Sequence, residues 1–321
     1  MEGTSASRNR RERCESARRV LDKAMRNCRL CPRRCGVDRF RGERGFCGLD
    51  DHMVVNCALP HYGEEPPLSG TGGAGTIFFS SCNLRCPYCQ NHQISHSVRG
   101  RPVSPDELAD MMLHLQELGC HNIEFVTGTP HVAGIVRGVG RALEQGLSLP
   151  LVYNCGGYES AEVVECLQGI IDVYLPDFKY GETEVIRRLG APPDYAERAL
   201  AALKIMIRQV GDGLILRDDA AYGGIIVRHL VLPGMVDNSL AVMRLLARHV
   251  SKSIPLSLMA QYTPMPLVAD DPLLGRRVAK DEYERVVNEA IALGFEYLFV
   301  QQVDTVDKIP DFDKTAPFQW N

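Results

Sequence analysis

The sequence lacks a long hydrophobic run and carries almost no net charge. Its 321 residues include 36 Lys or Arg and 40 Asp or Glu, a balance of −4. No apolar run approaches the roughly 18 residues of a membrane-spanning helix, so we expect no membrane span. The first 20 residues also lack the apolar stretch of a secretory signal peptide, which favours a cytoplasmic protein.

Aromatic residues are missing from the most basic part of the chain. Residues 1–45 hold 14 Lys or Arg and 6 Asp or Glu, and such a segment could bind nucleic acid or an acidic protein. No aromatic residue lies among these charges before Phe40, so there is no surface on which bases could stack. We therefore expect a solvated amphipathic helix at about residues 11–26 and no nucleic-acid partner.

Cysteine, by contrast, is abundant and unevenly placed. Six of the twelve cysteines lie in the first 57 residues, and three more lie between residues 82 and 89. In a reducing compartment, clustered cysteines indicate metal ligands rather than disulfides. Cysteines without ligand spacing, for which we expect buried apolar roles, include Cys120, Cys155 and Cys166.

From Thr76 the sequence alternates short apolar strands with amphipathic helices, which predicts parallel βαβ units in an α/β fold. The expected strands are 76–81, 122–128, 149–154, 170–178, 223–234 and 254–262, with 296–302 as a seventh candidate and 214–219 as a hairpin partner of the fifth. The expected helices are 104–119, 132–146, 159–168, 183–190, 195–209, 237–249 and 279–293. About six units are fewer than the eight of a closed barrel, so a partial barrel and a doubly wound sheet both fit.

These features divide the chain into four segments. Residues 1–58 form a basic helix and a Cys-rich metal-binding module, and residues 59–75, rich in proline and glycine, form an extended connector. Residues 76–305 form the barrel and residues 306–321 a C-terminal tail. Loops at the C-terminal ends of parallel strands build the sites of such folds, so we expect the functional residues there.

Three cysteines directly follow the first predicted barrel strand. Cys82, Cys86 and Cys89 are spaced C-x3-C-x2-C on one short loop. Three thiolates can bind three irons of a 4Fe–4S cluster and leave the fourth iron without a protein ligand, unlike the four-cysteine clusters of ordinary electron carriers. An open coordination position is where a substrate or cofactor binds. The alternatives are structural zinc and buried cysteines that hold no metal.

This loop resembles the signature of radical S-adenosylmethionine (SAM) enzymes, in which an aromatic residue, here Tyr88, precedes the last cysteine. The resemblance implies that SAM chelates the open iron and that an electron from the reduced cluster splits a carbon–sulfur bond of SAM. The resulting 5′-deoxyadenosyl radical abstracts a hydrogen atom from the substrate. The cofactor supplies the difficult chemistry, and the protein orients and shields it.

Further segments resemble one subgroup, the pyruvate formate-lyase-activating-enzyme-like radical SAM proteins. The resemblance runs from about Cys28 to Gln302 and includes CRLCPRRCGVDRFRGERGFCG, HYGEEP, LVYNCGGYE, LPDFKY, VRHLVLPG and MAQYTP. It implies a partial (β/α)6 TIM-like barrel, an oxidoreductase, and a reductant such as flavodoxin or ferredoxin. The substrate stays open between a glycyl radical enzyme partner, another macromolecule and a small molecule.

The resemblance also implies a set of SAM-binding positions. Gly128 and Thr129 stand where many relatives carry Gly-Gly-Glu-Pro, so backbone carbonyls or Thr129 would receive the SAM ammonium instead of a glutamate. Asp177 and Lys179 match the Asp-x-Lys of true activating enzymes, where the pair lies near SAM. The other cofactor-binding candidates are Tyr88, Asn154, Arg228 and Gln261.

Polar residues near the barrel entrance supply the remaining candidates. Arg228 and His229 share a predicted strand, so alternation puts them on opposite faces, and we expect Arg228 to bind a carboxylate inside the barrel. A lone strand histidine such as His229 is more often a packed group than a catalyst. The catalytic candidates, which are either a buried acid–base group or a solvated turn, are His61, Glu64 and Glu65.

A second set of four cysteines lies near the N-terminus. Cys28, Cys31, Cys35 and Cys47 supply four thiolates within twenty residues, and nearby glycines permit tight turns. Four thiolates close a tetrahedral zinc site, but they also complete an auxiliary iron–sulfur cluster. The spacing does not separate these two metals, and a segment without metal is the third alternative.

Two other classes of function compete with a radical SAM enzyme. A non-catalytic iron–sulfur or zinc protein would carry electrons or scaffold an assembly, and its cluster would be unaffected by SAM. A conventional SAM-dependent methyltransferase would need a glycine-rich loop after its first strand, where this chain has the cysteine loop.

Overall fold

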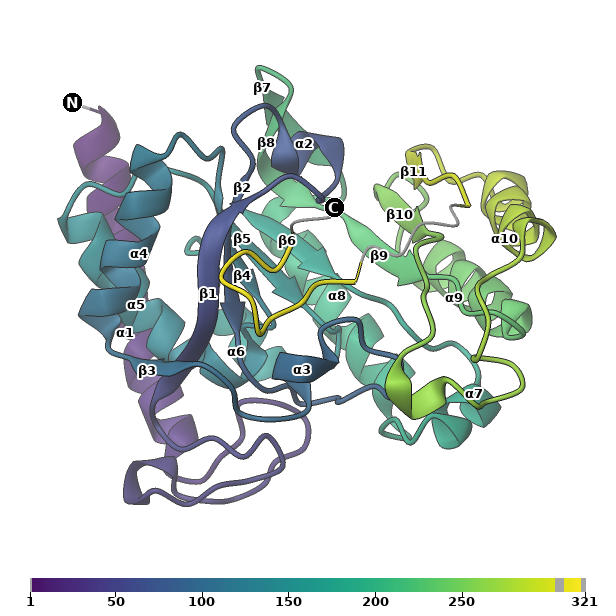
Figure 1. Cartoon of the computed structure of the whole chain (residues 1–321). Coiled ribbons are helices and arrows are strands. Elements are labelled where there is room, and N and C mark those ends of the chain that lie inside the picture. Colours follow the sequence, from purple (N-terminus) through teal and green to yellow (C-terminus); the bar gives the residue numbers. More distant parts are fainter. Residues whose placement is uncertain (1, 304–308, 319–321) are drawn as a thin grey trace.

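The computed structural model describes residues 2–303 and 309–318, and it shows a curved sheet whose outer face is covered by helices (Figure 1). The parallel strands, in spatial order, are β2 (Ala74–Phe79), β4 (Ile123–Val126), β5 (Leu151–Cys155), β6 (Val173–Pro176), β9 (Val227–Leu230), β10 (Leu256–Met259) and β11 (Leu298–Val300). A single bridge between Asp177 and Arg228 joins β6 to β9. The predicted partial TIM-like barrel is thereby confirmed.

The helices that connect these strands begin and end close to their expected positions. They are α4 (Pro105–Glu117), α5 (Val132–Glu144), α6 (Ala161–Cys166), α7 (Thr183–Arg188), α8 (Tyr195–Val210), α9 (Val236–His249) and α10 (Lys280–Leu293). At the start of α4, the Ser104 hydroxyl accepts from the Glu107 amide, and the Glu107 carboxylate accepts from the Ser104 amide. This capping box, with Pro105 in the first turn, fixes where the helix begins.

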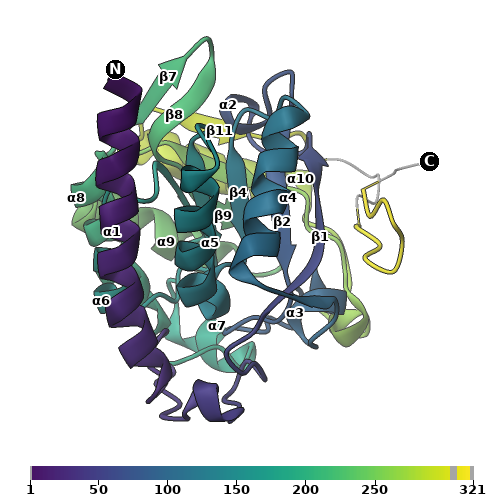
Figure 2. The same cartoon turned by 90° about the vertical axis from the view of Figure 1, so that its left-hand side faces the viewer.

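The N-terminal helix α1 (Glu2–Met25) is longer than expected and lies against α5 on the outside of the barrel (Figure 2). Asp22 pairs with Arg137 of α5, and Arg10 pairs with Asp172, the residue before β6. Arg18 binds Glu15 and Asp22 of its own helix. Arg10 and Arg18 of this basic segment are therefore paired within the chain.

A strand that the sequence did not predict, β1 (Met53–His61), pairs antiparallel with β2. It crosses residue 58, where we had placed the end of the Cys-rich module, so that boundary falls inside a strand. The expected extended connector 59–75 instead contains the end of β1 and the short helix α2 (Pro66–Ser69). Two short elements, α3 (His92–Ser95) and the edge strand β3 (Arg101–Val103), follow the cysteine loop.

The single strand expected at residues 223–234 is two strands. β8 (Ala220–Ile225) pairs with β6 and, as predicted, forms a hairpin with β7 (Leu214–Arg217). After Ile226 the chain continues as β9, which pairs with β10 instead. Gly224, at φ 112°, lies at this transition, where a side chain would collide with Gly213 O. The break lets one apolar segment serve two parts of the sheet.

Strand alternation separates an inner and an outer face of the barrel. Outward residues such as Tyr153 and Leu258 belong to the main apolar core. The end of the interior next to α2 is filled by a plug, a small cluster in which Leu68 of α2 packs with Val152 and Val173. Beyond this plug, the inner face carries polar side chains and encloses a cavity.

The C-terminal residues 309–318 lie across the side of the barrel next to β1 (Figure 1). Phe312 packs against Phe78 of β2, with ring centroids 5.4 Å apart. Gln93 of α3 accepts from the Phe312 amide at 2.8 Å. Part of the expected tail, residues 304–308 and 319–321, lies outside the described residues. Within the described part of the chain, we find no helix with the length and apolar character of a membrane span.

Candidate active site

The cysteine loop leaves the C-terminal end of β2 in a conformation that its surroundings hold. Ser81 (φ 72°) and Arg85 (φ 54°) both lie in the left-handed region, which is costly for residues other than glycine. The Ser81 amide donates to Ile94 O at 2.6 Å, and Asn83 Nδ2 donates to Tyr158 O at 2.8 Å. These bonds to other elements fix the path of the loop and so the direction of its cysteines.

The three cysteines of the loop are near neighbours in a buried site. Burial, together with the nearby Cys86 and Cys89, raises the pKa of the Cys82 thiol to about 12. Tyr180 Oη donates to Cys86 Sγ at 3.3 Å, and Ser95 Oγ to Cys89 Sγ at 3.3 Å. Buried thiolates that repel one another need a positive partner, which an iron cluster supplies. The donor set therefore fits an iron–sulfur cluster.

The sulfur positions also bear on the choice between a cluster and a single ion. Among the described residues, Asp50, Asp51 and His52 form the one group of three or more His, Cys, Asp or Glu side chains whose ligand atoms all lie within 4.8 Å of one another. Tetrahedral zinc with bonds of about 2.3 Å needs sulfurs about 3.8 Å apart. Cys82, Cys86 and Cys89 are thus too widely spaced for a preformed zinc site.

Tyrosines and one ion pair lie directly beneath the cysteine loop. Tyr88 Oη donates to Tyr180 Oη at 2.9 Å. Burial lowers the pKa of Lys179, but Asp177, its ion-pair partner, and Cys86 outweigh burial and raise the pKa well above the ordinary value. Lys179 therefore stays charged. The expected pair Asp177–Lys179 lies beside the cysteine loop. Tyr180 was not among the predicted site residues, although it directly follows Lys179.

Gly128 and Thr129 lie after β4, as expected, but the Thr129 side chain already has a partner. Its hydroxyl donates to Glu159 Oε1 at 2.6 Å, and Tyr153 Oη donates to Glu159 Oε2 at 3.3 Å. Burial raises the pKa of Glu159 to about 7. Because the hydroxyl donates its proton to Glu159, its lone pairs and the backbone carbonyls at Gly128 and Thr129 can all still accept from an ammonium group. Glu159 was not among the predicted site residues.

A cavity of about 1130 Å³ occupies the inside of the barrel. Gln90 and Asn91, which directly follow the cysteine loop, line it at one end. Glu64 and Glu65, before the plug helix α2, line it at the other. Gln261 lines the cavity near Gln90, whose side chain donates to Gln261 O at 3.0 Å. The cavity thus reaches from the cysteine loop to the plugged end of the barrel.

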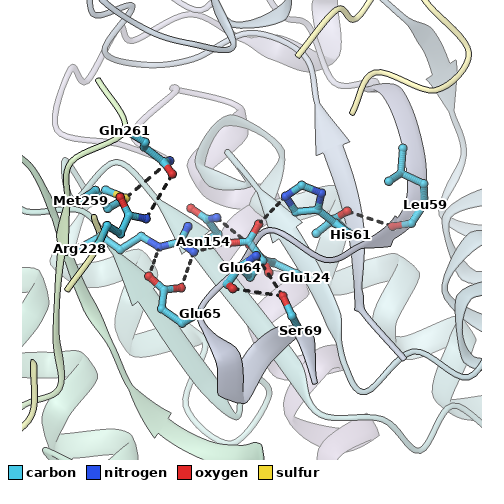
Figure 3. A network of polar contacts seen from close by, with 12 residues as sticks. Leu59, His61, Glu64, Glu65, Ser69, Glu124, Asn154, Arg228, Met259 and Gln261 are labelled. Atoms are coloured by element: carbon cyan, nitrogen blue, oxygen red, sulfur yellow. Dashed lines mark hydrogen bonds and ion pairs between the residues drawn. The ribbon is translucent and has the colours of Figure 1, made fainter. Parts of the chain in front are cut away.

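Charged side chains form a network at the plugged end of the cavity (Figure 3). Arg228 Nε donates to Glu65 Oε1 at 2.8 Å, and its Nη2 contacts both Glu64 and Glu65. His61 Nε2 lies 3.7 Å from Glu64 Oε1. Arg228 therefore binds carboxylates inside the barrel, and they are those of Glu64 and Glu65 in the cavity wall. The group is buried, not a solvated turn.

Three other polar residues show how the inner and outer faces of the barrel differ. Asn154 of β5 points inward and donates from Nδ2 to Glu124 Oε1 at 2.7 Å. Glu124 of β4 was not a predicted site residue, although a lone carboxylate in an apolar strand was a signal. His229 faces outward, where Nδ1 contacts Phe178 O at 2.7 Å and Nε2 contacts Ser239 Oγ at 2.8 Å. It is a packed histidine, on the opposite face from Arg228.

The N-terminal cysteines gather next to the cysteine loop. Burial raises the pKa of the Cys31 thiol to about 12, and the neighbouring Cys28 and Cys47 add to this rise. Arg33 Nε donates to Asn83 O of the cysteine loop at 2.6 Å. The Ser81 hydroxyl donates to Cys47 O. The Cys-rich segment and the loop after β2 are therefore in direct contact.

Comparison with known proteins identifies the family. The family model of the radical SAM superfamily matches residues 76–246, which is more than half of the chain. The chain belongs to the radical SAM superfamily. Membership makes it an enzyme, assigns a 4Fe–4S cluster and SAM as its cofactors, and sets aside a non-catalytic protein and a conventional methyltransferase.

Individual relatives of this radical SAM protein add little about its reaction. An uncharacterized protein of Methanocaldococcus jannaschii is 29% identical over 290 residues, which cover 87% of this chain and 79% of that protein. Coproporphyrinogen III oxidase of Escherichia coli, a radical SAM enzyme, is 13% identical over 68% of this chain, with a TM-score of 0.46. Methylornithine synthase is 15% identical over 68%, with a TM-score of 0.47. The chain spans 50% and 61% of those two structures.

Proposed function

We propose that the protein cleaves SAM reductively on a 4Fe–4S cluster held by Cys82, Cys86 and Cys89, and that the 5′-deoxyadenosyl radical so formed abstracts hydrogen from a substrate in the barrel cavity. The observation that carries this proposal is the set of three mutually interacting cysteines on the loop after β2, of which Cys86 is buried and the other two are half-buried. A bound cluster with one open iron would supply the electron and the site for SAM.

The residues around the loop have separable roles in this proposal. Lys179, kept charged by Asp177, would neutralise the SAM carboxylate. The backbone at Gly128 and Thr129 would receive the SAM ammonium. Tyr88 and Gln261 would border the bound SAM at the loop end of the cavity. A flavodoxin or ferredoxin would deliver the electron.

The test is anaerobic reconstitution with iron and sulfide, followed by addition of dithionite and SAM. We expect 5′-deoxyadenosine from the wild type and none from Cys82→Ala, Cys86→Ala or Cys89→Ala. Cys166→Ala is the matched control, because this half-buried cysteine on α6 is not part of the loop and its sulfur donates to Glu162 O in its own helix. A wild-type protein with a complete cluster that forms no 5′-deoxyadenosine under strong reduction would refute the proposal.

The subgroup resemblance leaves three substrate classes open, which are a small molecule, a backbone glycine of a glycyl radical enzyme and another macromolecule. The position of residues 309–318 favours the small molecule. This segment lies along the cavity, and Phe312 and Phe318 pack on Phe78 at ring distances of 5.4 and 5.1 Å. A protein loop would have to displace these rings before it could enter the barrel from that side.

For the N-terminal cysteines we propose an iron–sulfur cluster rather than zinc. As with the loop cysteines, no three of their sulfurs lie within 4.8 Å of one another, which does not match the compact tetrahedron of zinc. Metal analysis of the triple variant Cys82→Ala, Cys86→Ala, Cys89→Ala isolates this set. We expect iron and sulfide to remain in it. One zinc per chain and no iron would contradict the assignment.

A further inference from the structure

The plugged end of the barrel cavity is charged where barrels of this type have apolar layers. Interiors of (β/α) barrels are normally filled by stacked branched apolar side chains. Here that filling stops at Leu68, and above it Glu64, Glu65 and Arg228 border the cavity. Several charges are buried here, at a place where apolar side chains could have continued the core. Because buried charges need polar partners, this end of the cavity is suited to a polar occupant.

The charges at this end do not balance. Arg228 supplies one positive charge, and its Nε and Nη2 are directed at Glu65, which is only 8% exposed. Glu64 shares the same Nη2 and has its other oxygen 3.7 Å from His61. Burial lowers the pKa of His61, so the ring is neutral at neutral pH and adds no positive charge. One carboxylate is therefore left without a full counter-charge.

Glu124 is a second, independent sign of a missing partner. It is completely buried, and its Oε2 has no hydrogen-bond partner among the described residues. Its other oxygen accepts from Asn154, which lines the cavity (Figure 3). Burial and the adjacent Glu64 and Glu65 raise its pKa well above the ordinary value, although Arg228 opposes them. Such a carboxyl holds a proton until a positive charge arrives.

We propose that this end of the cavity binds a positively charged group of the substrate, an ammonium or a guanidinium, with Glu64 in contact with it and Glu124 behind. The inference rests on the proposed function, since it names the substrate class of the same site. The carbon to be attacked would then lie towards Gln90 and Asn91, at the loop end of the cavity. A divalent metal ion is not favoured, because no three ligand atoms meet here within 4.8 Å.

Binding of matched small probes tests the charge preference. The reconstituted full-length protein, with SAM but without reductant, is titrated by calorimetry with n-butylammonium, 1-butanol and butyrate. We expect butylammonium to bind at least about tenfold more tightly than the other two, and Glu64→Gln to remove about that factor. Glu117→Gln, an exposed carboxylate on α4, is the control that should bind as the wild type does.

A proton count tests the part assigned to Glu124. A cation that offsets the charge of Glu64 removes one of the causes that raise the pKa of Glu124, so titrations at pH 7.5 in phosphate and in Tris should report up to one proton released. Glu124→Gln keeps an acceptor for Asn154 and should release none, while its unfolding transition shows that the fold is kept. A wild type that releases no proton, or a variant that releases as many, would overturn the role of Glu124.

The outcomes separate this inference from the proposed function. Equal binding of the three probes, or unchanged binding by a folded Glu64→Gln variant, would overturn the cation site. Neither result depends on reduction, so a protein that still forms 5′-deoxyadenosine in the separate assay would retain its proposed function. Cation-selective binding that Glu64→Gln abolishes and Glu117→Gln preserves would support the site.

Discussion

At the scale of single residues, chemistry in this protein is decided by which face of a strand a side chain occupies. Arg228 and His229 are adjacent, yet one borders the cavity and the other is packed between Phe178 and Ser239. A buried imidazole that is already paired at both nitrogens is suited to hold β9 against α9. The fold holds this imidazole in its neutral form, so acid that protonates His229 should destabilise the fold.

We expect His229 to make the fold acid-labile. Burial lowers the pKa of His229 from 6.5 to about 4, so the unfolded chain binds this proton more readily than the folded one. The stability that its neutral form contributes is complete above pH 6.5 and falls as the pH drops towards 4, by about 3 kcal/mol in all. Denaturant unfolding of His229→Gln from pH 7 to pH 4 should lack this component.

The exposed His249, at the end of α9, is the matched position for this measurement. His249→Gln should leave the pH dependence as it is in the wild type. A His229→Gln variant whose stability falls with acid as steeply as that of the wild type would assign the acid lability to other groups.

At the scale of elements, short local signals fix where each βα unit begins. Ser104, Pro105 and Glu107 start α4, and the helix leads directly into the turn before β4. Elements without such signals were harder to place. β1 is missed because its pairing partner β2 lies thirteen or more residues away, and the division of 223–234 depends on which neighbouring strand is within reach.

Loss of the cap should destabilise the fold without touching the site. Ser104→Ala removes the acceptor for the Glu107 amide, at a cost of about 1 kcal/mol. Ser104→Asp keeps an acceptor and should lie within a few tenths of a kcal/mol of the wild type. Urea unfolding measures both. Equal stability of Ser104→Ala and the wild type would mean that the proline and the packing of α4 fix the helix start by themselves.

At the scale of the whole molecule, segments from both ends of the chain complete the barrel. The Cys-rich N-terminal segment contacts the cysteine loop through Arg33 and Cys47, and residues 309–318 lie along the cavity. An open barrel of six or seven strands would otherwise leave its polar interior in contact with water. Because few elements hold the C-terminal segment, it can open locally while the barrel stays folded.

We expect Phe312 to control this local opening. Its ring packs on Phe78, and Phe312→Ala should expose the backbone near Lys314, an accessible trypsin site. Trypsin cleavage after Lys314 should become about tenfold faster with little change in global unfolding. Leu267→Ala, at a side chain that is 69% exposed, is the control. Unchanged cleavage would show that Gln93 and the turn, rather than the phenylalanine rings, hold the segment.

The sequence by itself determined the features that depend on near neighbours in the chain. Apolar periodicity set the βα order, and the C-x3-C-x2-C spacing on one loop set the reactive centre, because three ligands within eight residues need no distant partner. Alternation in β9 likewise separated Arg228 from His229. Each of these features depends on residues that are close together in the chain, so the order of the residues is enough to predict it.

Only the tertiary structure decided what fills the barrel. Glu64, Glu124 and Arg228 come from three elements up to 164 residues apart, and no local pattern shows that they meet. The same holds for the contact of Cys47 with Ser81, which places the N-terminal cysteines beside the loop. Charge balance and burial depend on which groups from distant parts of the chain lie together in a space that excludes water.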